Sequence, residues 1–402
     1  MRSAGIATFF LALMLAATPK AAPLDSSASP AQGSSGSLDD ARAAMVAFQH
    51  GDSVRAIALL TSTLASGGLS PLQTSIVHYN LAYIYHSTAA NDKAMSECDQ
   101  AIALRPGYSD AFDLRASLFM ANGQIDKAIA DLKAALAADP HNAVALNNLG
   151  NAEHASGQGG SALGAYDAAI ASQPSPNAYE GRGLVELSQG QPEKAIADFT
   201  AAIGLKPDYA DAYVNRGDAY AASSQFDRAI ADFTTALQQS PGNAHAYADR
   251  ARVYSQSGKF DLAVADYTSA IKASPDDMAL FRARGVAYQA RHNFPLAIAD
   301  YNVVLGKSPA DAVALLNRGA AYAEQGDYDR AIADYDVALR SSPHDARLFN
   351  NRGNAYAAKG KLDLAIADYD AALGLDPANA DATRNRAGAL KAKITGATIH
   401  GP

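Results

Sequence analysis

The chain has 402 residues, and 49% of them are hydrophobic, with alanine as a large part of that share and no tryptophan. Alanine is the strongest helix former and leaves little bulk between packed backbones, so the composition favours closely packed helices. The formal net charge is −8. An acidic chain without a basic stripe argues against nucleic acid as a partner, because neutralising phosphates requires clustered Lys and Arg.

Residues 1–22 predict a secretory signal peptide. Arg2 supplies the positive start, and the apolar run from Ile6 to Ala17 has the length of a signal core. Ala17 and Ala22 are both candidate cleavage points. An uncleaved membrane anchor is the alternative, but the run is short for a bilayer. We therefore expect a periplasmic or secreted protein with no membrane span after cleavage.

The segment that follows, residues 23–36, is rich in Ser, Ala, Gly and Pro. It contains too little apolar surface to order itself by burial, so we expect a flexible linker. At the other end of the chain, residues 395–402 are expected to form a short tail.

Proline recurs with a step of 34 residues, interrupted by one step of 33. It occupies Pro106, Pro140, Pro174, Pro207, Pro241, Pro275, Pro309, Pro343 and Pro377. A 34-residue period is typical of helix–turn–helix repeats, which bury their apolar sides only against their neighbours. With each Pro counted as place 32, nine repeats fill residues 75–379 and start at Ser75, Ser109, Ala143, Pro176, Ala210, Ala244, Met278, Ala312 and Ala346. A degenerate repeat at 37–70 and a closing helix at 380–394 complete a predicted solenoid over 37–394.

Small residues recur where two helices would approach closely. Place 20 is always Ala, at Ala94, Ala128, Ala162, Ala195, Ala229, Ala263, Ala297, Ala331 and Ala365. Place 8 is always Gly or Ala, at Ala82, Ala116, Gly150, Gly183, Gly217, Ala251, Gly285, Gly319 and Gly353. A second set of glycines falls just past the first helix, where a left-handed residue closes the helix end: Gly123, Gly157, Gly190, Gly258, Gly326 and Gly360.

These places resemble the pattern of tetratricopeptide repeats across residues 37–394. One repeat, for example, has Tyr213, Tyr220 and Phe233 at the bulky places around its small ones. Departures are local, such as Glu153 and Glu186 in place of an aromatic residue at place 11. The resemblance implies an all-α fold, a right-handed α-solenoid superhelix of helix–turn–helix units, which binds a partner protein on its concave face.

Asparagine recurs at place 6 of the first helices, on the face that the resemblance assigns to binding. The place is occupied by Asn80, Asn148, Asn215, Asn317, Asn351 and Asn385, with Asp249 as an acidic equivalent. An amide donates and accepts, so it can bind a peptide backbone without requiring a particular side chain. The set is similar to the asparagine ladder of O-linked N-acetylglucosamine transferases, and Asn151, Asp218 and Asn354 extend the polar lining. Leu114, Gly181 and Ala283 interrupt it, and the alternative is that these amides form hydrogen bonds within the stack.

Charged residues recur at two further places. Place 7 is Arg115, Arg182, Arg216, Arg250, Arg284, Arg318, Arg352 and Arg386, and place 23 is Asp131, Asp198, Asp232, Asp266, Asp300, Asp334 and Asp368. In the one repeat with Leu149 at place 7, Ala165 replaces the acid. This covariation predicts that each Arg pairs with the Asp of its own repeat and joins its two helices. Arg386 has no second helix of its own, so it must pair elsewhere or face solvent.

Catalytic and cofactor motifs are missing from the sequence. His86 and His154 lie two repeats apart, which is too far to share a metal, and no phosphate-binding loop is present. The single cysteine, Cys98, excludes an internal disulfide and is expected to be a buried, inert thiol. We therefore expect no cofactor and no metal.

The function predicted from the sequence is a non-catalytic protein–protein interaction scaffold in the bacterial cell envelope, a monomer that binds a partner peptide or helix in its concave groove. One alternative is an accessory subunit of an envelope enzyme complex, such as a glycosyltransferase or cell-wall hydrolase. Another is a structural element that organises secretion or outer-membrane assembly.

Overall fold

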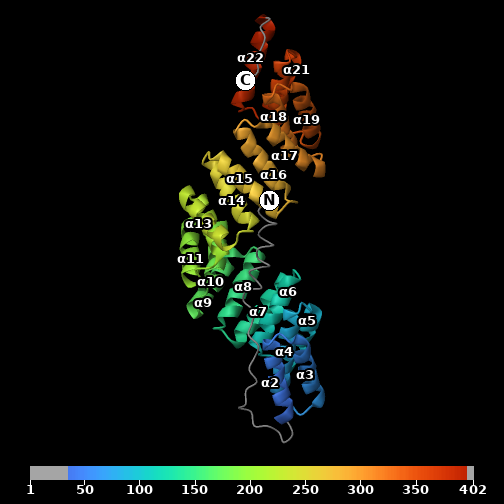
Figure 1. The fold of residues 1–402 in the computed structure, drawn as a ribbon, viewed down its shortest axis with the longest axis vertical. Helices are drawn as coiled ribbons and strands as arrows, with labels where there is room; N and C mark the ends of the chain where they lie inside the picture. Colours follow the sequence, from blue (N-terminus) through green and yellow to red (C-terminus); the bar gives the residue numbers. More distant parts are fainter. Residues whose placement is uncertain (1–34, 396–402) are drawn as a thin grey trace. The chain divides into compact units, whose positions relative to one another are not determined.

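The computed structural model of the protein describes residues 35–395. The predicted signal peptide, residues 23–34 of the predicted linker and residues 396–402 of the tail lie outside this range. The chain divides into two compact units, which are described separately: an N-terminal unit up to Ala219 and a C-terminal unit from Tyr220 (Figure 1). Within residues 35–395 every regular element is a helix, which confirms the predicted all-α class. None of these helices combines the length and apolar character needed to cross a membrane.

Even-numbered helices are the first helices of the repeats, and odd-numbered ones are the second. The N-terminal unit contains α2 (Ser35–Gln49), α3 (Ser53–Ser66), α4 (Pro71–Ser87), α5 (Asn91–Leu104), α6 (Ser109–Ala121), α7 (Ile125–Ala138), α8 (Ala143–Ala155), α9 (Gly159–Ser172), α10 (Pro176–Ser188), α11 (Pro192–Leu205) and most of α12 (Ala210–Ala222). The C-terminal unit contains α13 (Phe226–Gln239), α14 (Ala244–Gln256), α15 (Phe260–Ala273), α16 (Met278–Ala290), α17 (Phe294–Lys307), α18 (Ala312–Glu324), α19 (Tyr328–Ser341), α20 (Ala346–Ala358), α21 (Leu362–Leu375) and α22 (Ala380–Thr395). Consecutive helices pack against each other from α2 to α11 in the N-terminal unit and from α13 to α22 in the C-terminal unit.

Eight first helices, α6 to α20, begin at the residue where the 34-residue period places the start of a repeat. The exception is α4, which begins at Pro71 rather than Ser75. There the Ser70 side chain accepts from the Gln73 amide, and the Gln73 side chain accepts from the Ser70 amide. This capping box, with Pro71 at the first helical position, starts the helix one turn early.

The turn after each first helix requires a left-handed residue, and the six predicted glycines have φ between 71° and 80°. In three repeats the same place is held by Ala89, Ser224 and His292, with φ of 55° to 58°. Residues with a Cβ atom pay a steric cost in this conformation, so these three turns are less favourable than the others.

We expect Ala89→Gly to stabilise the protein by about 0.5–1 kcal/mol, because relief of the left-handed strain exceeds the entropy that glycine adds to the unfolded chain. The reverse change at an equivalent turn, Gly123→Ala, should destabilise it by about 1 kcal/mol. Urea unfolding followed by circular dichroism measures both, and two shifts of the same sign would contradict this interpretation.

The core of each repeat depends on close contact between its two helices. All nine place-20 alanines are 0% exposed. A Cβ atom added to Gly319 would lie 2.6 Å from the ring of Tyr335 at place 24, and Gly150, Gly183, Gly285 and Gly353 face rings in the same way. Where place 24 is a smaller residue, as at Leu132, place 8 is alanine, Ala116. In these five repeats the ring occupies the space that a Cβ atom would need, whereas the repeat over residues 244–277 combines Ala251 with the Tyr267 ring.

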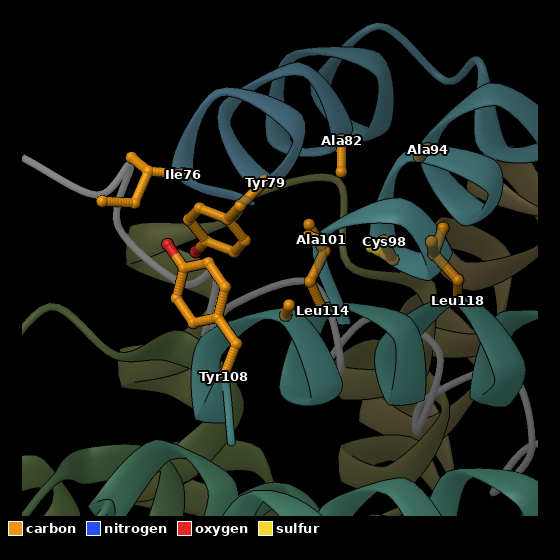
Figure 2. Close-up of a cluster of buried hydrophobic side chains, with 10 residues drawn as sticks. Ile76, Tyr79, Ala82, Ala94, Cys98, Ala101, Tyr108, Leu114 and Leu118 are labelled. Carbon is orange, nitrogen blue, oxygen red and sulfur yellow. The ribbon is translucent and has the colours of Figure 1, made fainter. Parts of the chain in front are cut away.

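The repeat over residues 75–108 has Cys98 at the place of that ring. Cys98 is 0% exposed and lies among apolar side chains that include Leu114 and Leu118 (Figure 2). Burial raises the pKa of the Cys98 thiol well above its ordinary value. The prediction that Cys98 is buried is confirmed. A raised pKa keeps the thiol protonated, and a protonated thiol is a poor nucleophile.

Candidate functional site

The predicted pairing of Arg at place 7 with Asp at place 23 is confirmed in six repeats. Each guanidinium donates from Nε and Nη2 to the two carboxylate oxygens of its own repeat, at 2.6–2.9 Å. The pairs are Arg115–Asp131, Arg182–Asp198, Arg250–Asp266, Arg284–Asp300, Arg318–Asp334 and Arg352–Asp368. The carboxylates are at most 10% exposed. Bidentate geometry with a buried carboxylate makes these strong, structural pairs.

The same guanidinium also binds the preceding repeat, which the sequence interpretation did not include. Its Nη1 donates to place 25 there, at 2.5–3.0 Å in the pairs Arg115–Asp99, Arg182–Asp167, Arg216–Thr200, Arg250–Thr234, Arg284–Thr268, Arg318–Asn302 and Arg352–Asp336. Arg386, on the closing helix, also binds place 25 of the preceding repeat, but it donates to Asp370 from Nε. The sequence contains a pattern that predicts this second bond, because place 25 of the preceding repeat carries a side-chain oxygen acceptor in every one of these pairs.

Several of the predicted partner-binding residues form hydrogen bonds within the stack, as the alternative interpretation held. Consecutive first helices pack against each other from α6 to α10 and from α14 to α22. Asn148 donates to Asp113 at 2.9 Å, and Asn215 donates to Glu180 at 2.8 Å, in each case from place 6 to place 5 of the preceding repeat. These amides therefore hold neighbouring repeats together.

Burial further limits which of the ten predicted residues a partner could reach. Asn80 and Asn151 are 0% exposed, and Asn151 accepts from the Tyr166 hydroxyl at 2.6 Å. Asn148 and Asn215 are each 7% exposed. The half-buried members are Asp218, Asp249, Asn317, Asn351, Asn354 and Asn385. We call the side formed by places 2, 5, 6 and 9 of the first helices the first-helix face.

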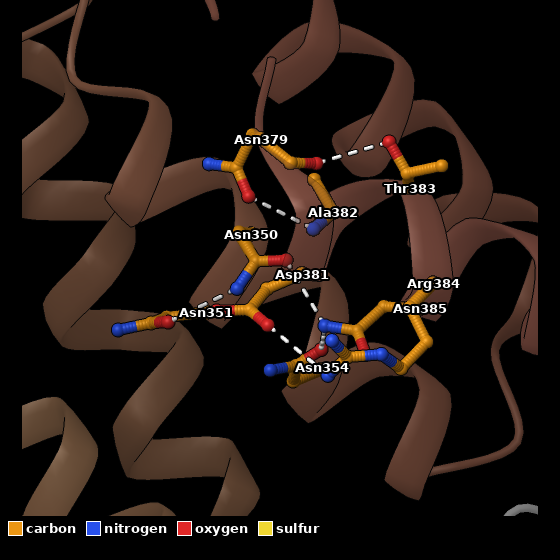
Figure 3. Close-up of polar contacts among 9 residues, drawn as sticks. All are labelled: Asn350, Asn351, Asn354, Asn379, Asp381, Ala382, Thr383, Arg384 and Asn385. Carbon is orange, nitrogen blue, oxygen red and sulfur yellow. Dashed lines mark hydrogen bonds and ion pairs between the residues drawn. The ribbon is translucent and has the colours of Figure 1, made fainter. Parts of the chain in front are cut away.

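At the end of the C-terminal unit, four amides form a connected cluster (Figure 3). Asn385 on α22 donates to Asn350 at 3.1 Å and to Asn354 at 3.0 Å, both on α20. Asn354 also accepts from the Tyr369 hydroxyl at 2.8 Å, and Asn350 donates to Asn351 at 3.5 Å. These bonds attach the closing helix to the last repeat and fix the orientation of the Asn350, Asn351 and Asn354 amides.

Within the same unit, the Asn317 side chain forms no hydrogen bond to any residue in the range 35–395. The Nδ2 of Asn351 likewise has no acceptor in that range. Two apolar side chains at first-helix-face places of the same unit are open to solvent, Val286 at 49% and Val313 at 52%. Half-exposed amides and exposed apolar residues on one face suit a polypeptide segment, which offers backbone amides and apolar side chains together.

Two buried carboxyl groups lie on the first-helix face of the N-terminal unit. Burial raises the pKa of Asp113 to about 7, opposed by the hydrogen bond from Asn148. Burial likewise raises the pKa of Glu180 to about 8, although it accepts from the Tyr209 hydroxyl and from Asn215. Both groups hold a proton more tightly in the folded protein than in the unfolded chain.

A raised folded-state pKa means that stability is complete at low pH and falls as pH rises toward the folded pKa. We therefore expect the melting temperature to be lower at pH 8.5 than at pH 5.5. The variant Asp113→Asn/Glu180→Gln, whose groups do not titrate, should show a smaller difference. Circular dichroism melts at the two pH values measure it, and an equal difference in the variant would contradict the assignment to these two groups.

No group of three or more His, Cys, Asp or Glu side chains that could hold a metal ion is found within residues 35–395.

The family models match this architecture. The tetratricopeptide repeat model matches residues 38–109, 114–179, 180–244, 283–346, 316–380 and 350–391, and a second model of the same description matches residues 220–285. The helix–turn–helix units and the ion pairs that recur in them define a helical repeat protein, a class whose members bind other proteins. The chain belongs to the tetratricopeptide repeat family. No curated protein sequence matches it.

Solved structures share the repeat fold. The C-terminal part of a repeat-containing protein from Cytophaga hutchinsonii is 18% identical with a TM-score of 0.52, and the match covers 60% of this chain and 98% of that one. A tetratricopeptide repeat protein from Parabacteroides merdae is 24% identical with a TM-score of 0.46, covering 58% and 92%. YrrB, described as having an unusual peptide-binding site, is 22% identical with a TM-score of 0.40, covering 46% and 97%. The first of these supports the solenoid fold of this chain.

Proposed function

We propose that this chain is a non-catalytic scaffold that holds an extended segment of a partner protein on the first-helix face of its C-terminal unit. Membership of the tetratricopeptide repeat family supports an interaction scaffold. The observation that carries the site is the pair of half-exposed amides, Asn317 and Asn351, with donors that no described residue uses. Such amides can bind a peptide backbone, and Val286 and Val313 can contact its apolar side chains.

The cluster of Asn350, Asn354 and Asn385 contributes by keeping the site rigid. An amide that is already oriented loses less side-chain entropy when a ligand binds, which increases affinity. Many weak amide and apolar contacts give a moderate, reversible affinity and tolerate different partner sequences. The proposed partner is therefore a neutral, extended segment with apolar side chains.

Affinity capture from the cell envelope fraction tests the proposal. The variant Asn317→Ala/Asn351→Ala should recover at least about fivefold less partner, since each lost hydrogen bond contributes about 0.5–1.5 kcal/mol. The matched control, Lys272→Ala/Val303→Ala, changes exposed side chains on the second helices α15 and α17. It should recover as much as the unmodified chain, and equal recovery by all three proteins would refute the site.

The envelope location is part of this proposal and depends on residues 1–22. Fractionation, together with mass spectrometry of the mature N-terminus, should find the chain outside the cytoplasm and shortened at Ala17 or Ala22. A full-length cytoplasmic product would overturn this part alone. Light scattering after gel filtration should give the mass of a monomer.

The alternative of an accessory enzyme subunit rested on the asparagine ladder alone. That ladder is interrupted at Leu114, Gly181 and Ala283, and three of its members, Asn148, Asn215 and Asn385, form bonds within the stack. We therefore favour the general scaffold.

A further inference from the structure

The repeat over residues 143–175, formed by α8 and α9, has fewer internal links than its neighbours. Its place 7 is Leu149 and its place 23 is Ala165, so it cannot form the Arg–Asp pair that joins the two helices in the repeats on either side of it. For the same reason it sends no guanidinium back to the preceding repeat, where place 25 is Lys133. Its backward polar links are the hydrogen bonds from Asn148 to Asp113 and from the Ser172 hydroxyl to the backbone oxygen of His141.

The forward link of this repeat is also incomplete. In the repeats on either side, Asp113 and Glu180 at place 5 each accept from an asparagine at place 6 of the next repeat. Asn147 occupies place 5 here, but place 6 of the next repeat is Gly181, which has no side chain to donate. A Cβ atom on Gly181 would lie 2.5 Å from the Tyr166 ring, so that ring takes the space.

This repeat is also one residue shorter than the other eight. The following repeat ends at Tyr209, whose hydroxyl donates to Glu180, and the repeat over residues 143–175 has no tyrosine at its end. Asn147 therefore keeps both Oδ1 and Nδ2 without a hydrogen-bond partner while only 3% exposed. The Nδ2 of Asn151, one turn further along α8, has no partner either. Buried donors and acceptors without partners favour the opened state, in which water satisfies them.

We propose that the repeat over residues 143–175 is an opening point of the N-terminal unit, where α8 and α10 separate by local unfolding before the neighbouring repeats open. The forward polar link that remains, from Arg182 to Asp167, ends on a carboxylate whose side chain is 62% exposed. Opening would uncover the Asn147 and Asn151 amides on the first-helix face. Use of those amides by a partner rests on the proposed function, whereas the opening itself does not.

Hydrogen exchange of the full chain, followed by mass spectrometry, tests the proposal. Peptides from α8 and α9 should exchange about tenfold faster than those from α6–α7 and α10–α11, after correction for intrinsic rates. Asn147→Leu removes the unpaired groups and should slow exchange in α8 by about fivefold. The matched control is Asn350→Leu, at the same place of another repeat, which removes the acceptor of Asn385 and should speed exchange in α20 and α22.

A second variant adds the missing links instead of removing the unpaired groups. Lys133→Thr/Leu149→Arg/Ala165→Asp copies the arrangement of Thr234, Arg250 and Asp266, and it should also slow exchange in α8 and α9. Protection of α8 and α9 equal to that of their neighbours, or faster exchange in Asn147→Leu, would overturn the proposal. Partner capture through Asn317 and Asn351 is unaffected by that result, so the two proposals fail independently.

Discussion

Arg318→Leu should destabilise the C-terminal unit by about 3 kcal/mol, because it leaves the Asp334 carboxylate buried without its bidentate partner. The Asp334 side chain is 8% exposed, so water cannot replace the guanidinium. The same change removes the link to Asn302 of the preceding repeat. Urea unfolding followed by circular dichroism measures the loss, and hydrogen exchange in α18 and α19 shows where it occurs.

The chain itself supplies the control for this prediction. Leu149 and Ala165 show that a repeat can hold two apolar residues in place of the pair. The double variant Arg318→Leu/Asp334→Ala should therefore be more stable than Arg318→Leu alone, by about 1–2 kcal/mol. If the two changes simply added, the pair would not be coupled in the way described here.

Gly319→Ala should destabilise the protein by about 1–2 kcal/mol, because the new methyl group would meet the Tyr335 ring at 2.6 Å. This overpacking exceeds the gain of about 1 kcal/mol that alanine normally brings to a helix. Gly164→Ala, in α9, is the matched control: no atom lies within 4 Å of the added Cβ, so it should stabilise the protein. Both are measured by urea unfolding.

A rescue experiment separates packing from backbone effects at Gly319. Gly319→Ala/Tyr335→Leu copies the natural combination of Ala116 and Leu132, in which place 24 is smaller. The double variant should therefore lose less stability than Tyr335→Leu alone. A further loss on adding the alanine would show that the glycine is needed for another reason.

Features that repeat were predictable from the sequence, because nine copies of one pattern average out local variation. The 34-residue period predicted the starts of the eight first helices from α6 to α20. The presence of Leu149 and Ala165 in the same repeat predicted that Arg at place 7 pairs with Asp at place 23. The early start of α4 was missed because a local capping box at Ser70 and Gln73 takes precedence over the period.

The candidate site was less predictable, because a side chain at one repeat place can face either the partner or the adjacent repeat. Asn148 and Asn317 occupy the same place, but only Asn148 has a carboxyl group opposite it, at Asp113. The orientation of each amide therefore depends on two repeats together, and the residue at one place does not decide it. The second bond of each place-7 Arg was not predicted either, because it depends on place 25 of the preceding repeat and not on the repeat that contains the Arg.

Site-specific photo-crosslinking in the cell envelope is the most direct test of the scaffold account. A photoreactive residue at position 351, on the first-helix face, should form adducts with a partner protein, and the same residue at position 272, on α15, should not. Adducts from both positions in similar yield, or from position 272 alone, would contradict a partner held on the first-helix face.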